Sequence, residues 1–286
     1  KFDFTFNVDV TIPLLKDVKA QAPHAICELV TTNVSFNLIV NQFKPPFDNA
    51  KIRKAMVMTM DRKAFIDILS EGQNVQGGAM MPPPSGVWGM PPEFLKTVAG
   101  YSSDVAGNRA KARKIMESLG YGPDNKLKVK VSTRNIAVYR DPAVILIDHM
   151  KEIYIDATLD TVETSNWHAK VARKDYMVGL NLTGIGVDDP DANFYENYSC
   201  GSQRNYTGYC KPEMEALFEK QSMMEDQAAR KKLVWEIDKK LQEDAARPMI
   251  MHGKAAQCWQ PYVKGFVTHV NSIYNNWRME DVWLDK

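Results

Sequence analysis

Between residues 126 and 182 the chain alternates strand-like and helix-like segments, and this alternation restricts the fold more than any other feature. The segments "KLKVKVS" (126–132) and "IDATLDTVE" (155–163) place apolar residues at alternate positions, and "YMVGLNL" (176–182) is a third strand-like run. Two helix-like segments separate them, "RDPAVILIDHMKEI" (140–153) and "NWHAKVARK" (166–174). Strand–helix–strand alternation predicts an α/β domain.

The flanking segments add further expected elements. We predict strands at "FDFTFNVDV" (2–10) and "ICELVTTNVSFNLIVNQ" (26–42), and shorter ones at "PMIMHG", "YVKGFVTHV" and "EDVWL". Residues that cap or open helices predict where several helices begin: Asp48 and Asp61 as N-caps, Pro142 in the first turn of the helix at 140–153, and Pro212 in the first turn of another. The remaining helices are expected at 104–120, 210–224 and 226–245.

Residues 77–93, "GGAMMPPPSGVWGMPPE", predict neither a helix nor a regular strand. This segment contains five prolines and four glycines, which favours a long loop that crosses the surface. Met80, Met81 and Trp88 lie in this loop. They could adapt to a varied apolar ligand, but covering the core is the interpretation that we favour.

Charge and hydropathy exclude two classes of protein. The chain has 286 residues, with 36 Lys and Arg against 35 Asp and Glu, whereas a nucleic-acid-binding protein needs a basic excess. No apolar run reaches the ~18 residues that a membrane-spanning helix needs. The length suffices for one large domain or two smaller ones.

Four cysteines are present, and two of them bracket a short polar loop. Cys200 and Cys210 enclose "GSQRNYTGY", which can bring its ends to disulfide distance and would then indicate an oxidising compartment. Two buried free thiols are the alternative. Nothing local pairs Cys27 with Cys258, and no zinc-ligand spacing occurs.

The segment "GVDDPDANFYENYSC" (186–200) combines acids, an amide and aromatic rings directly after a predicted strand. A solvated turn needs the acids but not the rings, and a core needs the rings but not the acids. Ligands of open α/β sheets bind at the carboxyl ends of strands. We therefore expect this segment, with Asp188, Asp189 and Asn193, to form the wall of a ligand cleft.

The stretch "VNQFKPPFDNAKIRKAMVMTMDRKAFIDIL" (40–69) resembles the signature of the family 5 extracellular solute-binding proteins, the dipeptide and oligopeptide receptors of ABC importers. The matching features are the Lys-Pro-Pro-Phe-Asp motif, the Arg-Lys-Ala helix and the Asp-Arg helix start. Further matches follow in the same order along nearly the whole chain: "MMPPPSGVWG", the Asp-Pro-Asp-x-Asn-Phe loop, "NYTGYC", "VKGFVTH" and "DVWL".

The resemblance implies a periplasmic-binding-protein-like fold (type II, cluster C), with two lobes joined by crossing strands. It places residues 1–38 and 253–286 in a few strands of the first lobe and residues 39–252 in a ligand-binding second lobe with a mixed sheet and flanking helices. The crossings are expected near Asn41 and His252. The opening residues read as a strand already under way, so we expect a chain that begins inside a longer protein and lacks most of the first lobe.

Peptide-binding members of this family offer an acid to the ligand's amino group and an arginine to its carboxylate. Asp188 and Asp189 lie in the matching loop, although the family's acid usually falls where this chain has Gly184–Gly186. One of these aspartates could instead cap the following turn. The arginine falls in "RNIAVYR", which holds the candidates Arg134, Tyr139 and Arg140, and a guanidinium suits a carboxylate through its planar fork.

Each of these arginines could also be an ordinary surface residue. Trp167 opens a short helix at the end of a strand, where it could stack on a ligand or pack the core.

The resemblance implies capture of a small solute, a peptide or a related compound, by closure of the two lobes. The closed receptor would deliver it to an ABC permease in the membrane. It implies no catalysis, no cofactor, no nucleic acid, a monomer, and a periplasmic or other extracytoplasmic location. Sugars, opine-like conjugates and metal chelates remain open as ligands. The alternative is a hydrolase or metal-dependent enzyme that uses the acidic loop 188–191, although no nucleophile elbow or phosphate loop occurs.

Overall fold

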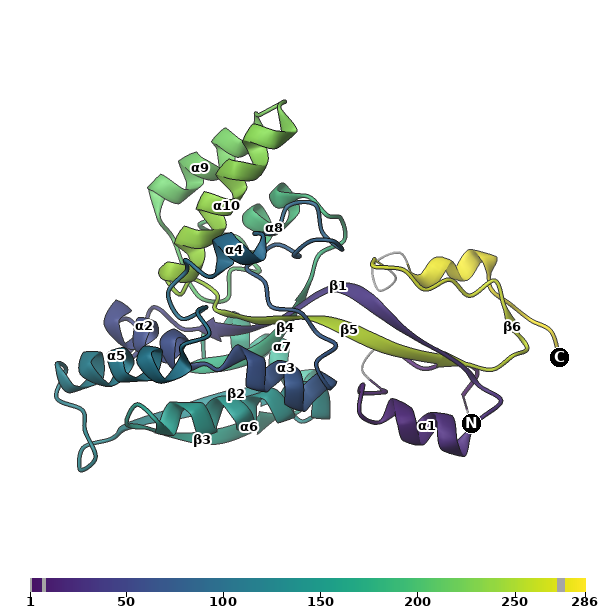
Figure 1. The fold of residues 1–286 in the computed structure, drawn as a ribbon, viewed down its shortest axis with the longest axis horizontal. Helices are drawn as coiled ribbons and strands as arrows, with labels where there is room; N and C mark the ends of the chain where they lie inside the picture. Colours follow the sequence, from purple (N-terminus) through teal and green to yellow (C-terminus); the bar gives the residue numbers. More distant parts are fainter. Residues whose placement is uncertain (1, 7–8, 272–275) are drawn as a thin grey trace.

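The computed structural model describes residues 2–6, 9–271 and 276–286, and its centre is a five-stranded mixed sheet (Figure 1). The strands lie in the order β3-β2-β4-β1-β5; β2 runs parallel to β3 and β4, and β1 runs antiparallel to β4 and β5. The predicted α/β class with a mixed sheet is confirmed. The strand bounds are β1 Ile26–Val40, β2 Leu127–Arg134, β3 Ile155–Val162, β4 Val178–Gly184, β5 Met249–Trp259, β6 Val263–Lys264 and β7 Trp283–Leu284.

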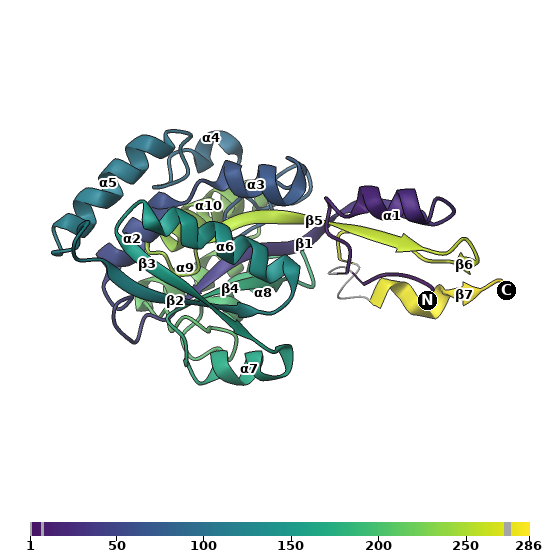
Figure 2. The ribbon, with the colours of Figure 1, turned by 90° about the horizontal axis from the view of Figure 1, so that it is seen from below.

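Helices cover the sheet and form a further layer beyond it. In Figure 1, α8, α9 and α10 stand above the sheet, whereas Figure 2 shows α3, α5 and α6 on one side of β2 and β3 and α7 on the other. None of the helices among residues 2–6, 9–271 and 276–286 has the length and apolar character that a bilayer span requires. The bounds are α1 Leu15–Gln21, α2 Ala50–Thr59, α3 Arg62–Ser70, α4 Pro92–Leu95, α5 Val105–Glu117, α6 Ala137–Lys151, α7 Thr164–Ala172, α8 Pro190–Asn197, α9 Pro212–Ser222, α10 Gln227–Glu243 and the 3-10 helix η1 Asn276–Asp281.

The largest core lies between the sheet and helices α2, α3, α5 and α6 (Figure 2). Alternate residues of β1 supply one side of it, with Leu38 and Val40 fully buried, and Phe65 of α3 and Leu146 of α6 supply the other. The intervening β1 residue Ile39 points to the opposite face and packs with α7. This alternation is the consequence of a pleated strand with helices on both of its faces.

A second core joins α8, α9 and α10 to the proline-rich loop 77–93. Met80 and Trp88 of the loop pack with Phe194 of α8 and Ile237 of α10. The predicted surface course of this loop is wrong, because most of residues 77–82 and 88–90 are buried. The preferred interpretation, in which Met80, Met81 and Trp88 cover the core, is confirmed.

β1 and β5 continue beyond the sheet as a two-stranded ribbon (Figure 1). β1 pairs with β4 only from Val34 onward, whereas its earlier residues pair with β5 alone. The ribbon leads to α1 and to the small β6–β7 pair, and a disulfide joins Cys27 to Cys258 across it. The sequence had left these two cysteines unpaired.

Some predicted element boundaries are wrong. Residues 2–6 and 9–10 form no regular strand, and Phe4 makes only an isolated bridge to Trp259. The N-cap of α2 is Asn49, whose side chain accepts from Lys51 N, rather than Asp48. Pro142 lies inside α6 rather than in its first turn, because the helix begins earlier, at Ala137.

Candidate functional site

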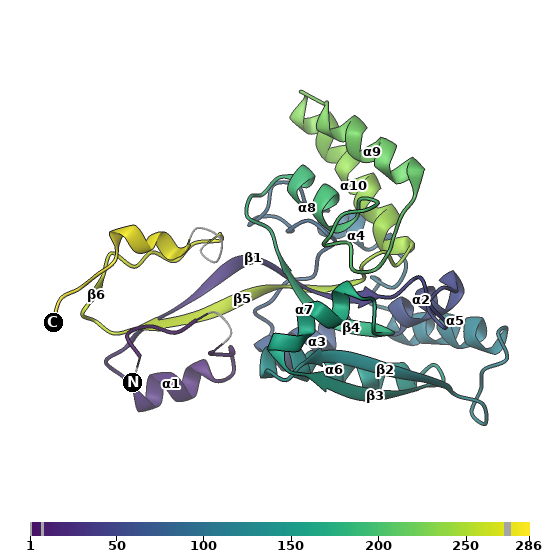
Figure 3. The same ribbon diagram turned by 180° about the vertical axis from the view of Figure 1, so that it is seen from behind.

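The carboxyl ends of β2, β3 and β4 lie at one edge of the sheet, because these strands run parallel. The last residue of β4, Gly184, pairs with Val34, so this edge lies where the ribbon leaves the sheet (Figure 3). Loops at such an edge are where open α/β sheets bind ligands. Most of the side chains predicted from the sequence follow one of these three strands.

Arg134, the last residue of β2, is half-buried and makes no ion pair with any described residue. Its Nη1 donates to Tyr139 Oη at 3.2 Å, and the guanidinium lies 4.7 Å from the centre of the Tyr139 ring. Its Nη2 lies 3.1 Å from His168 Nε2. Because all of these neighbours are uncharged or cationic, the guanidinium keeps its capacity to bind an anion such as a carboxylate.

Tyr139 contacts this guanidinium through both its ring and its hydroxyl group. Its side chain is buried, and its hydroxyl accepts the Arg134 hydrogen bond. Burial raises the pKa of Tyr139, with the Arg134 charge opposing the shift. The phenol is therefore a neutral support for Arg134 throughout the physiological range.

The surroundings of His168 are electropositive. Its pKa is lowered first by burial and then by the positive charges of Arg134 and Arg204. Arg204 comes from the loop between the two cysteines and forms an ion pair with Glu196 at 2.7 Å. β2 and the cysteine loop thus place two cationic groups, Arg134 and Arg204, near the imidazole that α7 carries.

Two other candidates have partners within the protein. Arg140 Nε lies 3.4 Å from a carboxylate oxygen of Asp141 in an exposed ion pair. Trp167 is fully buried and packs with Ile39 and Val171, and its indole Nε1 has no hydrogen-bond partner among the described residues. In this conformation the Trp167 ring has no surface to offer a ligand.

The acidic loop turns directly into α8. Asp189 is the N-cap of this helix, with its carboxylate accepting from Asp191 N at 2.9 Å, and Pro190 occupies the first turn. The same carboxylate forms an ion pair with Arg230 of α10 at 3.0 Å. The sequence allowed a capping role for one of these aspartates, and Asp189 has that role.

Asp188 and Asn193 attach the proline-rich loop to this region. Asp188 accepts from Val87 N at 2.8 Å, and burial raises the pKa of its carboxyl group. Asn193, buried on α8, donates to Ala79 O at 2.7 Å. Arg230 lies 4.6 Å from the centre of the Trp88 ring. These contacts bind loop 77–93, α8 and α10 into one unit.

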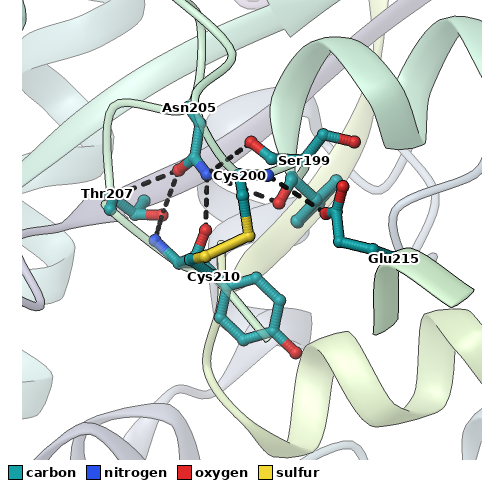
Figure 4. Close-up of a disulfide and its surroundings, with 9 residues drawn as sticks. Ser199, Cys200, Asn205, Thr207, Cys210 and Glu215 are labelled. Atoms are coloured by element: carbon teal, nitrogen blue, oxygen red, sulfur yellow. Dashed lines mark hydrogen bonds between the residues drawn. A yellow bond between two sulfur atoms is a disulfide. The ribbon is translucent and has the colours of Figure 1, made fainter. Parts of the chain in front are cut away.

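A disulfide between Cys200 and Cys210 closes the loop that carries Arg204, as predicted (Figure 4). Inside the loop, Asn205 donates to Ser199 O at 3.0 Å and accepts from Gly208 N at 3.1 Å. Glu215 of α9 accepts from Cys200 N at 3.0 Å. The loop is therefore fixed both by covalent and by hydrogen bonds.

Arg247, between α10 and β5, is an arginine that the sequence did not indicate. It is 2% exposed and donates to Arg204 O at 2.9 Å and to Thr183 Oγ1 at 3.1 Å. No carboxylate pairs with it among the described residues, and burial lowers its pKa. It fixes the backbone of the cysteine loop to β4.

The structure thus divides the predicted residues into two groups. Arg134 and Tyr139 contact each other at the sheet edge, whereas Asp188 and Asn193 contact the proline-rich loop and Asp189 joins α8 to α10. His168 and Arg204 were missed, although His168 follows Trp167 directly and Arg204 lies inside the predicted disulfide loop. The described residues contain no group of three or more His, Cys, Asp or Glu side chains that could hold a metal ion.

Comparison with known proteins begins with a family model. The model described as "Bacterial extracellular solute-binding proteins, family 5 Middle" matches residues 6–205, which is more than half of the chain. The family resemblance that the sequence motifs indicated is confirmed.

Among curated proteins, the chain is similar to the periplasmic oligopeptide-binding protein OppA of Haemophilus influenzae, with 23% identity over 81% of this chain and 42% of that protein. It is also similar to the probable deoxycholate-binding periplasmic protein YgiS of Escherichia coli, with 21% identity over 93% of this chain and 48% of that protein. The chain therefore spans less than half the length of these relatives.

The solved structure of Haemophilus influenzae OppA in complex with the peptide RPPGFSPFR has the same fold. It superposes with a TM-score of 0.85 at 20% identity, and the match covers 100% of this chain and 54% of that one. The predicted fold of the periplasmic-binding-protein type is confirmed.

Proposed function

Because the chain belongs to family 5 of the bacterial extracellular solute-binding proteins, we propose that it is the substrate-binding component of an ABC importer. It captures a peptide or peptide-like solute and delivers it to a permease in the membrane. The observation that carries this proposal is the half-buried guanidinium of Arg134, which stands at the carboxyl edge of the sheet without a carboxylate partner among the described residues. A solute carboxylate would supply that partner.

The two-stranded ribbon suits a receptor that closes around its solute. We infer that residues 39–252 form one lobe and that residues 1–38 and 253–286 belong to the other. Since β1 pairs with β4 from Val34 onward, we propose a crossing near Val34, with residues 34–38 in the sheet of the second lobe, rather than the crossing near Asn41 that the sequence predicts. Pairing between β1 and β5 also shifts register between Thr31 and Ser35, and such irregularity lets a ribbon bend.

We also propose an extracytoplasmic location and a monomeric receptor. Relatives of the chain are named as periplasmic proteins. Two disulfides, Cys27–Cys258 and Cys200–Cys210, suit an oxidising compartment. Because the relatives' names include both oligopeptides and deoxycholate, the family alone does not fix the solute.

The alternative of a hydrolase or metal-dependent enzyme is not favoured by the acidic loop. Asp189 caps α8 and pairs with Arg230, and Asp191 accepts from Ser222 Oγ at 2.6 Å. Asp188 is engaged by Val87 N. Carboxylates held in this way serve the local structure rather than a general base or a metal ion.

A thermal-shift screen against dipeptides, tripeptides and longer peptides tests the proposal. A ligand that binds only the native state raises Tm in a concentration-dependent way. For a peptide that binds, Arg134→Gln should weaken the affinity roughly tenfold or more, because a charge-assisted hydrogen bond is lost. Isothermal titration calorimetry gives the two dissociation constants.

Two controls make the test specific. Arg173→Gln removes an exposed arginine at the end of α7 and should leave the affinity unchanged. The same peptide with a C-terminal amide should bind weakly to the wild type and lose little more in Arg134→Gln. Equal loss for the free acid and the amide would show that Arg134 does not bind the solute's carboxylate.

A further inference from the structure

A cavity of about 450 Å³ lies where α3, α6, the ribbon and the segment before α1 meet. This volume is in the range that proteins use for small ligands. The candidate residues Arg134, His168 and Asp188 do not line it. Its walls are mostly apolar, and they include Ile12, Phe36, Leu69, Val138, Ile145 and Met251.

Polar groups in this cavity are few, and most of them already have partners. Both polar atoms of the Asn74 amide have a partner, since its Nδ2 contacts Met251 Sδ at 3.3 Å and its Oδ1 accepts from Lys254 N at 2.8 Å. Asp141 pairs with Arg140, and Thr11 Oγ1 accepts from Leu14 N. The ammonium group of Lys254 has no hydrogen-bond or ion-pair partner in the described part of the chain.

Two exposed apolar side chains also line this cavity. Ile68 of α3 is 61% exposed and Val144 of α6 is 51% exposed. Single exposed apolar residues are ordinary on protein surfaces, but two that line the same apolar cavity indicate a surface that takes an apolar group. The cavity therefore offers apolar walls, apolar side chains exposed to solvent and one unpaired cation.

We propose that this cavity binds a small apolar monocarboxylic acid, with the Lys254 ammonium holding the carboxylate and the walls holding the hydrocarbon part. A neutral apolar molecule in the cavity would leave the Lys254 ammonium unpaired, and a hydrophilic anion would leave the apolar walls uncovered. An apolar acid satisfies both features.

A ligand in this cavity would affect the closure of the two lobes, because the cavity lies beside the ribbon that joins them. Phe36 and Met251 belong to the crossing strands β1 and β5, and Val10–Pro13, which precede α1, line the same cavity as residues of α3 and α6. A ligand here contacts both bodies that the ribbon joins, at a place separate from the solute site. Occupancy would therefore favour one arrangement of these bodies over another.

Octanoate is the probe, with 1-octanol and octylamine as uncharged and cationic analogues of the same chain length. In calorimetric titrations below the micelle concentration, octanoate should bind the wild type roughly tenfold or more tightly than either analogue. Lys254→Met keeps the length of the side chain and should abolish this preference. Lys264→Met removes an exposed lysine of β6 outside the cavity and should leave it unchanged.

The position of the bound acid is tested independently of Lys254. In spectra of the protein with labelled methionine methyl groups, octanoate should shift Met251, which lines the cavity, and not Met80, which lies in the core of α8–α10. Val144→Trp adds bulk where the cavity wall is exposed and should weaken octanoate binding. Because Val144 is largely exposed, this variant should fold normally, as its melting curve will show.

Several outcomes would overturn the proposal. Octanoate and octanol could bind equally, Lys254→Met could keep the preference for the acid, or Met251 could remain unshifted. The proposed transport function is separate: saturating octanoate should change the affinity of a peptide that binds through Arg134, because both ligands act on the arrangement of the two bodies, but it should not displace that peptide from its own site. Peptide binding without octanoate binding would refute only the second site, and the reverse would leave the peptide proposal unsupported.

Discussion

Asp238 of α10 is a carboxylate buried without a counter-ion among the described residues. It is 0% exposed, and it accepts from Ala79 N at 2.8 Å and from Gln242 Nε2 at 3.1 Å. Burial raises its pKa to about 6, with these hydrogen bonds opposing the shift. Gly78 leaves room for it, since a Cβ there would lie 2.2 Å from Asp238 Oδ2. The carboxylate thus holds the start of the proline-rich loop at the cost of burying a charge.

The titration of Asp238 predicts a pH-dependent contribution to stability. A pKa raised above its unfolded value of 3.8 means that the native state binds the proton more tightly. The stabilisation is therefore complete below the unfolded pKa and is lost as pH rises through about 6. When the pH falls from about 8 to about 4, the free energy of unfolding of the wild type should rise by about 2 kcal/mol relative to that of Asp238→Asn.

Urea unfolding of both proteins at the two pH values measures this difference. The comparison between variants is necessary because His252, whose Nε2 donates to Gly78 O at 2.8 Å, titrates in the opposite sense. Burial lowers its pKa to about 4, so its contribution is lost as pH falls. His252 is present in both proteins and cancels. A constant difference at both pH values would show that Asp238 is not buried as a charge.

At the scale of elements, hydrophobic periodicity and capping residues predicted most of the helices and strands. The failures have physical causes that lie far away in the sequence. The proline-rich loop is buried because side chains of α10 contact it: Asp238 and Trp235 hydrogen-bond to its backbone, and Arg230 packs on the ring of Trp88. These partners lie about 150 residues away in the sequence, so the local sequence pattern does not predict them. The strand expected at residues 2–10 alternates correctly, but a strand also needs a neighbour to pair with.

Helix α8 was missed although the sequence contained its signal. Asp189 followed by Pro190 is an N-cap residue followed by a first-turn proline, which marks the start of a helix. The acids and rings of the same segment also fit a cleft wall, and that pattern masks the helix start. The ligand roles of Asp188, Asp189 and Asn193 remain predictions, and their observed contacts are structural.

The two roles of Asp189 can be separated by substitution. Asp189→Ala removes both the cap of α8 and the ion pair with Arg230, and it should lower the free energy of unfolding by about 1–2 kcal/mol. Asp189→Ser keeps a capping oxygen and should recover most of that loss. Chemical denaturation of the three proteins measures both effects. If serine were as destabilising as alanine, the ion pair rather than the cap would hold this turn.

At the scale of the whole molecule, the candidate site could be predicted only in part. Distances between β2, α7 and the cysteine loop cannot be read from the sequence, so the grouping of Arg134 with His168 and Arg204 required the fold. Arg134 was recognisable because it lies shortly after a predicted strand, in the loop where the family resemblance places an arginine. The sequence could not predict whether Trp167 is buried or exposed. One face of a short helix such as α7 lies toward the sheet and the other toward solvent, and the sequence does not show on which face Trp167 lies.

The two disulfides constrain the chain on very different scales. Cys200–Cys210 closes a sequence separation of 10 residues, whereas Cys27–Cys258 closes one of 231 across the ribbon. A cross-link stabilises mainly by restricting the unfolded chain, and this restriction grows with the logarithm of the closed length. The chain-entropy argument gives about 3 kcal/mol for the short loop and about 5 kcal/mol for the long one.

We therefore expect the double variant Cys27→Ser/Cys258→Ser to lose more free energy of unfolding than Cys200→Ser/Cys210→Ser. Guanidinium denaturation of both variants, with the wild type as reference, measures the two losses. The pairs are remote from each other, so a variant lacking both disulfides should lose the sum of the two. The opposite order would mean that the short bridge stabilises chiefly through the folded state, by fixing Arg204 and Asn205, and that the ribbon stays paired without its covalent link.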